Sequence, residues 1–322
     1  MKVLITNPNM RYPASMAEPL EAIAEIVVAP QASPAAIREF GADADALIVA
    51  IETIDAQTIA ALRTCRQIHR IGVGVDFVDI DAATRHGIQV TNVPDANYKE
   101  VGTHAIALIL ALTRRLADWD RNVRSGKFGD RALGMSLRRT DHQVVGLIGF
   151  GRIGRHVGAA AGALGYRVLA HDPALAAGSP SGVSGLELVD LPTLFAAADI
   201  VSVHVPLTEG TRHLLDAAAL AQLKPGSIVI NVSRGGIIDE DALAAALYSG
   251  HIAAAGIDTF ETEPLPADST ILAAPNTLLS PHAAHYSSDA MGETLEKSFA
   301  EVARFLRGQP PLYPVNTPVE RE

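Results

Sequence analysis

The sequence predicts an α/β protein built from two doubly wound parallel sheets. The chain has 322 residues, which exceeds one typical domain. Short apolar runs recur along it, separated by segments with helical spacing. Their hydrophobicity is continuous rather than alternating, as in parallel strands that are buried on both faces. The rhythm stops at a long helical segment and then starts again, which indicates two domains of the same class.

The first series contains five predicted strands: VLIT (3–6), EIVVA (25–29), ALIVA (46–50), IHRIGVG (68–74) and IQVTN (88–92). A helix is expected at about 99–118. Its apolar stretch at 105–113 is shorter than the roughly 18 residues that cross a bilayer, so we expect a buried helix. The second series contains QVVGLIG (143–149), RVLAHD (167–172), DIVSVH (199–204), SIVINVS (227–233), IAAAGID (252–258) and NTLLS (276–280).

Two further segments stand outside the two series. Residues 119–141 are polar and rich in arginine and glycine, as expected of a linker or of an arm that contacts another subunit. The final segment, 288–306, is expected to form an amphipathic helix. Its apolar face comprises Met291, Leu295, Phe299, Val302 and Leu306.

The composition excludes several classes of protein. Hydrophobic residues make up 48% of the chain and the formal net charge is −10, with no basic block, which argues against a nucleic-acid partner. A single cysteine, Cys65, rules out an intrachain disulfide framework and agrees with a reducing compartment. The N-terminal run lacks an apolar signal core. We therefore expect a cytoplasmic protein with no membrane partner.

A glycine-rich turn follows the first strand of the second series. Gly149, Gly151 and Gly154 form a G-x-G-x-x-G pattern between a strand and a helix. These glycines permit a tight turn, a close approach of the backbone to a pyrophosphate, and close packing of helix on strand. The next strand ends at Asp172, 18 residues after Gly154, where a carboxylate can bind ribose hydroxyls and would repel a 2′-phosphate. The pattern predicts an NAD site; the competing interpretation is a tight turn without a ligand.

Three successive strands of this series end in polar side chains. Arg234 follows one strand, Asp258 and Glu263 follow the next, and His282 follows the third. Ligands bind beyond the carboxyl ends of parallel strands, so these groups are expected to meet. A guanidinium suits a carboxylate with an adjacent carbonyl oxygen, and an imidazole beside a carboxylate exchanges a proton near neutral pH. The set predicts an imidazole that can exchange a proton beside a guanidinium that can bind a carboxylate.

Other kinds of site compete with this interpretation. Arg234 alone would be an ordinary surface charge. His282 and His285 form a His-x-x-His pair, but no cysteine or third histidine lies nearby in the sequence, so we expect no metal. Hydrolysis by a Ser-His-Asp triad would require a G-x-S-x-G elbow, which is absent from the sequence.

With these residues assembled, the chain resembles the D-isomer-specific 2-hydroxyacid dehydrogenase family over nearly its full length. The motifs that carry the resemblance are GVGVDFVDIDAATRHGIQVTNVPDAN, GLIGFGRIG, VHVPLTEGTRHLLD, NVSRGGIIDEDAL, GIDTFETEPLP and SPHAAH. YKEVGTHAIALILAL and PHAAHYS are more similar to the subgroup with phosphoglycerate-dehydrogenase-like proteins and C-terminal-binding-protein corepressors.

The resemblance implies a Rossmann dinucleotide-binding domain at 99–287 and a flavodoxin-like substrate domain formed by 1–98 and 288–322, with a cleft between them. It also implies that 119–141 is a dimerisation arm of a homodimer. Arg234 would bind the substrate's carboxylate and oxo oxygen, His282 would donate the proton, and Glu263 would bond to His282. The backbone at Val73 and Gly74 would hold the substrate carboxylate. The residues expected to contact NAD are Gly149, Gly151, Arg152, Ile153, Gly154, Asp172, His204, Val205, Pro206, Val232, Ser233, Asp258, His282 and Ala284.

The expected reaction is hydride transfer between nicotinamide and C2 of a small 2-hydroxy or 2-oxo acid. Relatives that oxidise 3-phosphoglycerate tend to carry an arginine after the third strand, where this chain has Ala50 and Glu52. A carboxylate there would repel phosphate, although Glu52 as a solvated loop charge is an equal alternative. We therefore expect an unphosphorylated acid such as glyoxylate, hydroxypyruvate or a polyhydroxylated analogue. Residues after the first strand that are expected near its tail are Asn7, Asn9, Arg11 and Tyr12.

Two alternative functions stay open. One is a D-3-phosphoglycerate dehydrogenase, although the sequence shows no C-terminal regulatory extension of the kind some of these enzymes carry. The other is a corepressor-like binding protein that senses NADH. Thr103 replaces a usual acidic residue, which we expect to be a packing difference. His285 replaces a frequent tryptophan, and we expect it to shape the pocket wall.

Overall fold

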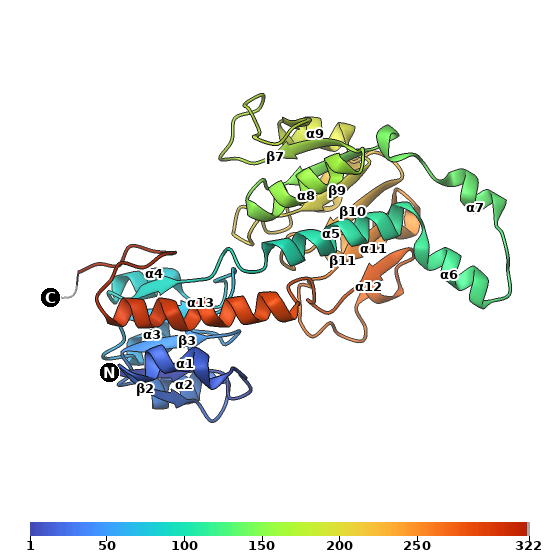
Figure 1. The fold of residues 1–322 in the computed structure, drawn as a ribbon. Coiled ribbons are helices and arrows are strands. Elements are labelled where there is room, and N and C mark those ends of the chain that lie inside the picture. The colour runs from blue at the N-terminus through green and yellow to red at the C-terminus, as the bar shows by residue number, and fades with distance from the viewer. Residues whose placement is uncertain (321–322) are drawn as a thin grey trace. The chain divides into compact units, whose positions relative to one another are not determined.

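The computed structural model describes residues 1–320, and the chain divides into two compact units (Figure 1). Unit 1 contains Met1–Asn97 and the segment that begins at Tyr286. Unit 2 is the continuous stretch Tyr98–His285.

Unit 1 is built on a five-stranded parallel sheet in the order β2-β1-β3-β4-β5. This is the flavodoxin-like strand order. The strands are β1 (Lys2–Ile5), β2 (Glu25–Val28), β3 (Ala46–Val49), β4 (Gln67–Arg70) and β5 (Gln89–Thr91). Every residue of β3 is buried, because helices cover both faces of the sheet.

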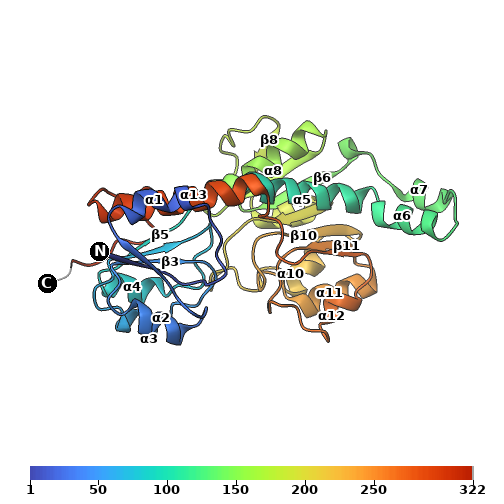
Figure 2. The same ribbon diagram turned by 60° about the horizontal axis from the view of Figure 1, so that its bottom comes forward.

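Two layers of helices cover the sheet of unit 1 (Figure 2). One layer is α1 (Ala14–Glu21) and α13 (Ser288–Leu306), and the other is α2 (Pro34–Gly41), α3 (Ala56–Ala61) and α4 (Ile80–Arg85). The predicted apolar face of α13 is correct for Phe299, Val302 and Leu306, which are buried in the core beside β1.

The expected face of α13 is less accurate near its start. Met291 and Leu295 are only half-buried, whereas Thr294 and Ser298 are buried. The two hydroxyl groups donate to helix carbonyls one turn earlier, at 2.6 and 2.7 Å. These bonds satisfy the hydroxyls inside the core, so polar residues occupy positions that the hydrophobic pattern does not reveal.

The segment after α13 covers the free edge of β5. Thr91 pairs with Pro314 in an antiparallel bridge, and Val315 donates its amide to Val90. The side-chain oxygen of Asn316 accepts the amide of Val90 at 2.7 Å. An edge strand that is paired in this way offers no open edge to another chain.

Unit 2 contains a seven-stranded parallel sheet in the order β12-β11-β10-β9-β6-β7-β8. Counted from β6, this is the Rossmann order with one strand added. The strands are β6 (Val144–Ile148), β7 (Arg167–His171), β8 (Leu186–Leu188), β9 (Ile200–Val203), β10 (Ser227–Asn231), β11 (Ile252–Ile257) and β12 (Thr277–Leu279). β8 has no counterpart among the predicted strands.

The helices of unit 2 also form two layers (Figures 1 and 2). One contains α5 (Tyr98–Thr113) and α8 (Arg152–Ala163). The other contains α9 (Leu191–Ala197), α10 (Ala217–Gln222), α11 (Glu240–Ser249) and α12 (Thr270–Ala273). Among residues 1–320, no helix is long and apolar enough to cross a membrane.

The prediction of one helix over 99–118 is wrong at its C-terminal end. α5 ends at Thr113, and Arg115 adopts a left-handed conformation with a φ of 54°. The chain then forms α6 (Leu116–Arg124), α7 (Arg131–Ser136) and a short 3₁₀ helix at Thr140–His142, which extend away from the sheet of unit 2 (Figure 1). Thr103 is exposed on α5, so the expectation that it reflects a packing difference is also wrong.

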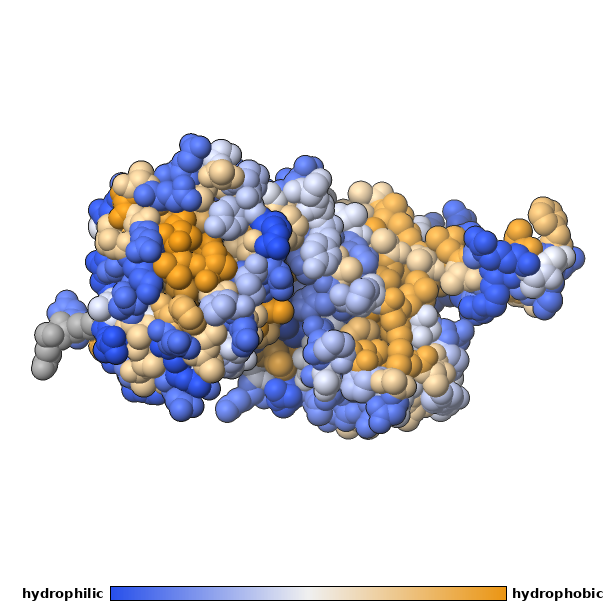
Figure 3. All heavy atoms as spheres, turned by 90° about the horizontal axis from the view of Figure 1, so that it is seen from below, coloured by the Kyte–Doolittle hydropathy of each residue, from blue (hydrophilic) through white to orange (hydrophobic). Residues whose placement is uncertain are grey.

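The arm at 119–141 carries apolar side chains in the open. Val123, Phe128 and Met135 are exposed, Phe128 to 95%. Figure 3 shows apolar and polar atoms side by side over this part of the surface. Large apolar groups left in water at a projecting segment are typical of a surface that contacts another chain.

Candidate active site

The glycine-rich turn joins β6 to α8 and leaves room for a ligand. Gly149 has a φ of +96°, and a Cβ there would lie 2.6 Å from the carbonyl oxygen of His204. A Cβ on Gly154 would lie 2.3 Å from the carbonyl oxygen of Gly149. At Gly151, by contrast, a Cβ would meet no atom within 4 Å. The turn is therefore tight where it packs and open at the N-terminus of α8, next to Arg152 and Ile153, which fits a pyrophosphate.

Asp172 follows β7 and is held in place by two backbone amides. Its Oδ2 accepts a hydrogen bond from the amide of Phe150 at 2.9 Å, and its Oδ1 accepts one from Ala174 at 3.0 Å. Phe150 lies between the first two glycines of the turn, so the carboxylate is fixed beside the turn. Each oxygen keeps a further lone pair that can accept a ribose hydroxyl.

The neighbouring strand ends complete this edge of unit 2. His204 follows β9, and its amide donates to the carbonyl of Ile148 at 2.7 Å. The hydroxyl of Ser233, after β10, donates to the carbonyl of Val203. Burial lowers the pKa of His204 to about 3, so its ring is neutral. These bonds bring the predicted cofactor residues that follow β9 and β10 to one edge of the sheet. Besides His204 and Ser233, these residues are Val205, Pro206 and Val232.

Arg234 lies in a loop that packs tightly against the loop of Glu263. Its carbonyl accepts the side-chain amide of Asn231 at 2.8 Å, and its guanidinium donates to the carbonyl of Ser233 at 2.8 Å. A Cβ on Gly235 would lie 1.8 Å from the carbonyl oxygen of Phe260. Only glycine fits there, and the loop that carries Arg234 therefore packs directly on the loop that carries Glu263.

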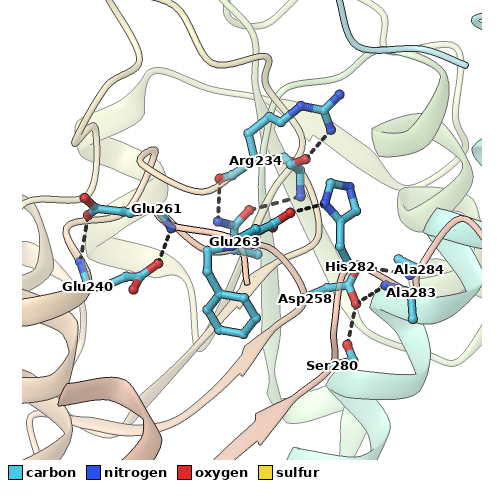
Figure 4. A network of polar contacts seen from close by, with 12 residues as sticks. Arg234, Glu240, Asp258, Glu261, Glu263, Ser280, His282, Ala283 and Ala284 are labelled. Carbon is cyan, nitrogen blue, oxygen red and sulfur yellow. Dashed lines mark hydrogen bonds and ion pairs between the residues drawn. The ribbon is translucent and has the colours of Figure 1, made fainter. Parts of the chain in front are cut away.

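Glu263 and His282 form a direct pair (Figure 4). The Nδ1 atom of His282 lies 2.8 Å from Oε2 of Glu263, while Oε1 accepts the amide of Phe260 at 3.0 Å. The two side chains are 36% and 37% exposed. Glu263 thus orients the imidazole through Nδ1. In Figure 4 the guanidinium of Arg234 and the ring of His282 extend to the same side of the strand ends.

Asp258 organises the turn that carries His282. Its side chain is fully buried, and its two oxygens accept the amides of Ala283 and Ala284, both at 2.9 Å. Its carbonyl accepts the amide of His282 at 2.7 Å. The hydroxyl of Ser280 donates to Oδ1 at 2.5 Å. The buried carboxylate and the backbone carbonyl of Asp258 together therefore fix three consecutive residues of the turn (Figure 4).

The sequence interpretation missed several polar residues around this site. His104 on α5 bonds to Ser280 at 3.0 Å. Its polar ring inside the apolar stretch of α5 is the one signal that could have indicated it. Glu240 and Glu261 accept each other's backbone amides, at 2.6 and 3.3 Å. Burial raises the pKa of the Glu240 carboxyl. This reciprocal pair joins the start of α11 to the loop of Glu263.

The two histidines of the His-x-x-His pair have different surroundings. The rings of His282 and His285 lie edge to face, with centroids 5.7 Å apart. Only His282 bonds to Glu263 in the contacts described above. Within residues 1–320, no three histidine, cysteine or acidic side chains form a group that could hold a metal ion.

In unit 1, Val73 and Gly74 lie in the loop that follows β4. The carbonyl of Gly72 accepts the amide of Val93, and the carbonyl of Val73 accepts the side chain of Asn92 at 2.6 Å. Arg70 ends β4 at the same edge, with its guanidinium 5.9 Å from the centre of the Phe77 ring. This cation next to the predicted substrate loop was not weighed from the sequence.

Glu52 is not a solvated loop charge. It is 5% exposed and accepts hydrogen bonds from the hydroxyl of Thr6 at 2.6 Å, the side chain of Asn7 at 2.9 Å and the amide of Ala50 at 3.0 Å. Its carboxylate is used to hold the two loops after β1 and β3. The expectation that Glu52 acts as a repulsive charge on a ligand therefore loses its basis.

The expected tail-binding residues are also engaged within unit 1. Asn7 bonds to Glu52 and accepts the amide of Asn9. The guanidinium of Arg11 donates to backbone carbonyls of its own loop. Tyr12 is partly buried and packs on Phe299 of α13 in a tilted arrangement, with ring centroids 4.7 Å apart. The ring of Tyr12 is thus used for packing, and its expected contact with a ligand stays a prediction.

The fold and the site together define an NAD-binding α/β protein with an acid–base pair at its sheet edge. Residues 106–284 match the family described as D-isomer specific 2-hydroxyacid dehydrogenase, NAD binding domain. The chain belongs to the D-isomer-specific 2-hydroxyacid dehydrogenase family, as its motifs predicted.

The relatives that are similar to this chain are named for different activities. The chain is 39% identical to a D-3-phosphoglycerate dehydrogenase of Mycobacterium leprae, over 82% of this chain and 49% of that protein. It is 38% identical to a hydroxypyruvate reductase of Thermotoga maritima, over 81% of this chain and 85% of that protein. A solved structure of a glyoxylate reductase from Paecilomyes thermophila matches with a TM-score of 0.88 and 26% identity, over 98% of each chain. The chain thus spans about half the length (49%) of the phosphoglycerate dehydrogenase.

Proposed function

We propose that the protein is an NAD-dependent D-2-hydroxyacid dehydrogenase that reduces a small, unphosphorylated 2-oxo acid. The observation that carries this proposal is the arrangement of Arg234, Glu263 and His282 at one edge of the unit 2 sheet. Glu263 holds Nδ1 of His282 at 2.8 Å, so Nε2 is the nitrogen that can exchange a proton with a substrate.

When bound, NADH would supply the hydride to C2. Arg234 binds the substrate's carboxylate and oxo oxygen, because its planar fork matches that pair of acceptors. His282 donates a proton from Nε2 to the oxo oxygen as the alcohol forms. Glu263 stabilises the charged form of the imidazole before transfer. Since the ring is 36% exposed, solvent can return the proton afterwards.

The cofactor preference follows from Asp172. Its carboxylate is fixed beside the glycine turn by the amides of Phe150 and Ala174. It accepts the two ribose hydroxyls of NAD and repels the 2′-phosphate of NADP. Backbone groups at Gly151 and the first turn of α8, including Arg152 and Ile153, bind the pyrophosphate.

We further propose that residues 1–98 and 288–322 form the substrate domain and 99–287 the cofactor domain. In the first, the backbone at Val73 and Gly74 binds the substrate carboxylate. The arm at 119–141 places its exposed side chains, among them Phe128, against a second copy in a homodimer. Sedimentation equilibrium of the intact protein and of Phe128→Ser tests the homodimer. The intact protein is expected to be a dimer, and the dimer of the variant is expected to dissociate more readily.

Two substrate classes can be separated by experiment. The hydroxypyruvate and glyoxylate reductases among the relatives support an unphosphorylated acid. One observation favours D-3-phosphoglycerate instead: Arg70 ends β4 beside the substrate loop, and a guanidinium there suits a phosphate. Glu52 gives no argument either way, because its oxygens are bonded to Thr6, Asn7 and Ala50.

The test is NADH oxidation with glyoxylate, hydroxypyruvate and 3-phosphohydroxypyruvate as substrates. Higher kcat/KM on the first two supports the proposal. A preference for the phosphorylated acid that is lost in Arg70→Ala would establish the second candidate. Tight NADH binding without turnover on any 2-oxo acid would instead indicate the corepressor-like role.

A further inference from the structure

His104 is linked to the catalytic turn through one intermediate side chain. It lies on α5, with its side chain 29% exposed, and its Nε2 is 3.0 Å from the hydroxyl oxygen of Ser280. That hydroxyl donates to Oδ1 of Asp258 at 2.5 Å. The same ring nitrogen lies 3.7 Å from Oδ1 of Asp258. We call these three residues the His104 chain.

The hydrogen bonds of the His104 chain run in one direction. An ionised carboxylate only accepts, so the proton of Ser280 points to Asp258. The oxygen of Ser280 must then accept a hydrogen bond from His104, which requires a proton on Nε2 of the ring. The His104 chain therefore connects α5, through the hydroxyl at the end of β12, to the buried carboxylate at the end of β11.

Asp258 in turn fixes the conformation of the turn that bears the proton donor. It accepts the amides of Ala283 and Ala284 on its side chain and that of His282 on its carbonyl (Figure 4). His282 has a φ of 52°, a left-handed conformation that is strained for a residue other than glycine. Such a conformation persists only where surrounding bonds hold it. The orientation of Asp258 therefore decides where the imidazole of His282 points.

We propose that His104 is a positioning residue for the acid–base group of this enzyme. Its Nε2–H fixes the hydroxyl of Ser280, which fixes the carboxylate of Asp258 and thereby the turn of His282. In the contacts given above, His104 reaches Ser280 and Asp258 and not the imidazole of His282 itself. The proposal rests on the proposed function, since it assigns His104 a part in proton donation by His282. The competing explanation is that His104 only fills space between α5 and the sheet.

Two substitutions at one position separate these explanations. His104→Gln keeps an N–H donor the same number of bonds from the backbone as Nε2, whereas His104→Phe keeps the ring and loses the donor. His251→Phe is the matched control, because it removes a hydrogen bond of the same length, 3.0 Å, to the carbonyl of Leu220. His251 precedes β11, at the opposite end of that strand from Asp258.

In His104→Phe, kcat for the best 2-oxo acid is expected to fall about threefold to tenfold, the equivalent of one neutral hydrogen bond. His104→Gln is expected to recover most of the loss. Ser280→Ala is expected to lower kcat as well, and the double variant with His104→Phe to lose no more than the larger single effect, because both break one chain. Equal kcat in His104→Phe and His251→Phe would overturn the proposal. So would an equal loss in His104→Phe and His104→Gln.

A second measurement does not depend on turnover. Amide hydrogen exchange of residues 280–286 is expected to be faster in His104→Phe than in wild type, to return in His104→Gln, and to stay unchanged in His251→Phe. Failure of the wild-type protein to oxidise NADH with any 2-oxo acid would end the proposed function. Unchanged exchange in His104→Phe would end the positioning role, whatever the activity.

Discussion

Replacing Glu263 by glutamine tests the proposed proton donor most directly. One oxygen of Glu263 accepts the amide of Phe260 and the other faces Nδ1 of His282. In Glu263→Gln the remaining oxygen is expected to stay with Phe260, so the amide NH₂ group faces Nδ1. Two donors then meet whenever His282 is protonated, and the charged imidazole loses its partner. NADH binding should not change, because Glu263 touches no residue of the glycine turn in the bonds described above.

The size of the effect follows from the geometry of the pair. A hydrogen bond to a charged group contributes about 1.5–3 kcal/mol, and each 1.36 kcal/mol corresponds to a tenfold change in rate. Both side chains are more than one-third exposed, at 36% and 37%, so solvent screening favours the lower end. We expect kcat for reduction to fall about tenfold to thirtyfold.

The assay is steady-state NADH oxidation at saturating 2-oxo acid, with NADH affinity measured by fluorescence. Glu187→Gln is the control, since Glu187 on β8 is an exposed partner of Arg167 on β7 and lies outside the site. It should leave both quantities unchanged. A kcat for Glu263→Gln within about twofold of wild type would show that the carboxylate does not support proton donation.

Three further predictions concern single residues. Asp172→Ala should weaken NADH binding strongly without unfolding the protein, and unchanged affinity by fluorescence titration would contradict the assignment of the ribose site. His282→Ala should keep NADH binding and lower turnover by orders of magnitude, on the scale of roughly 10²–10⁴-fold for a lost acid–base group; a comparable loss in His285→Ala but not in His282→Ala would reverse their roles. Burial lowers the pKa of His69 from 6.5 to about 3. As the pH falls from about 6.5 to 3, the unfolded chain therefore binds a proton at His69 that the folded chain does not bind. The free energy of unfolding therefore decreases over this range. In His69→Gln, urea titrations should show a decrease between pH 6.5 and 4.5 that is about 2 kcal/mol smaller than in wild type. An identical pH dependence in wild type and variant would refute this expectation.

The strands of both units were largely predictable because helices bury both faces of each sheet. Continuous apolar runs such as the one at 46–49 then mark strands without ambiguity. β8 escaped prediction because it is a three-residue strand at the edge of its sheet, where the middle residue, Glu187, is exposed. The break of α5 at Arg115 depends on a single left-handed residue, for which the sequence carries no glycine or proline signal.

The clustering of the residues proposed for catalysis was predictable for a topological reason. Parallel strands end at one edge, so residues that follow neighbouring strands must lie close together, as Arg234, Glu263 and His282 do. His104 could not be found this way, because its contact with Ser280 depends on the rotation of α5 about its axis. The burial of Glu52 was likewise hidden, since it requires the loop after β3 to fold back onto Thr6.

The way unit 1 is assembled has a consequence for the order in which the nascent chain folds. Its core joins Val3 and Ile5 of β1 to Phe299 and Val302 of α13, almost three hundred positions apart. Unit 2 is one continuous stretch and can fold as soon as it leaves the ribosome. The strands of unit 1 are made long before α13 and can complete their core only after α13 has been synthesised, so they are exposed to chaperones and proteases while unit 2 is made.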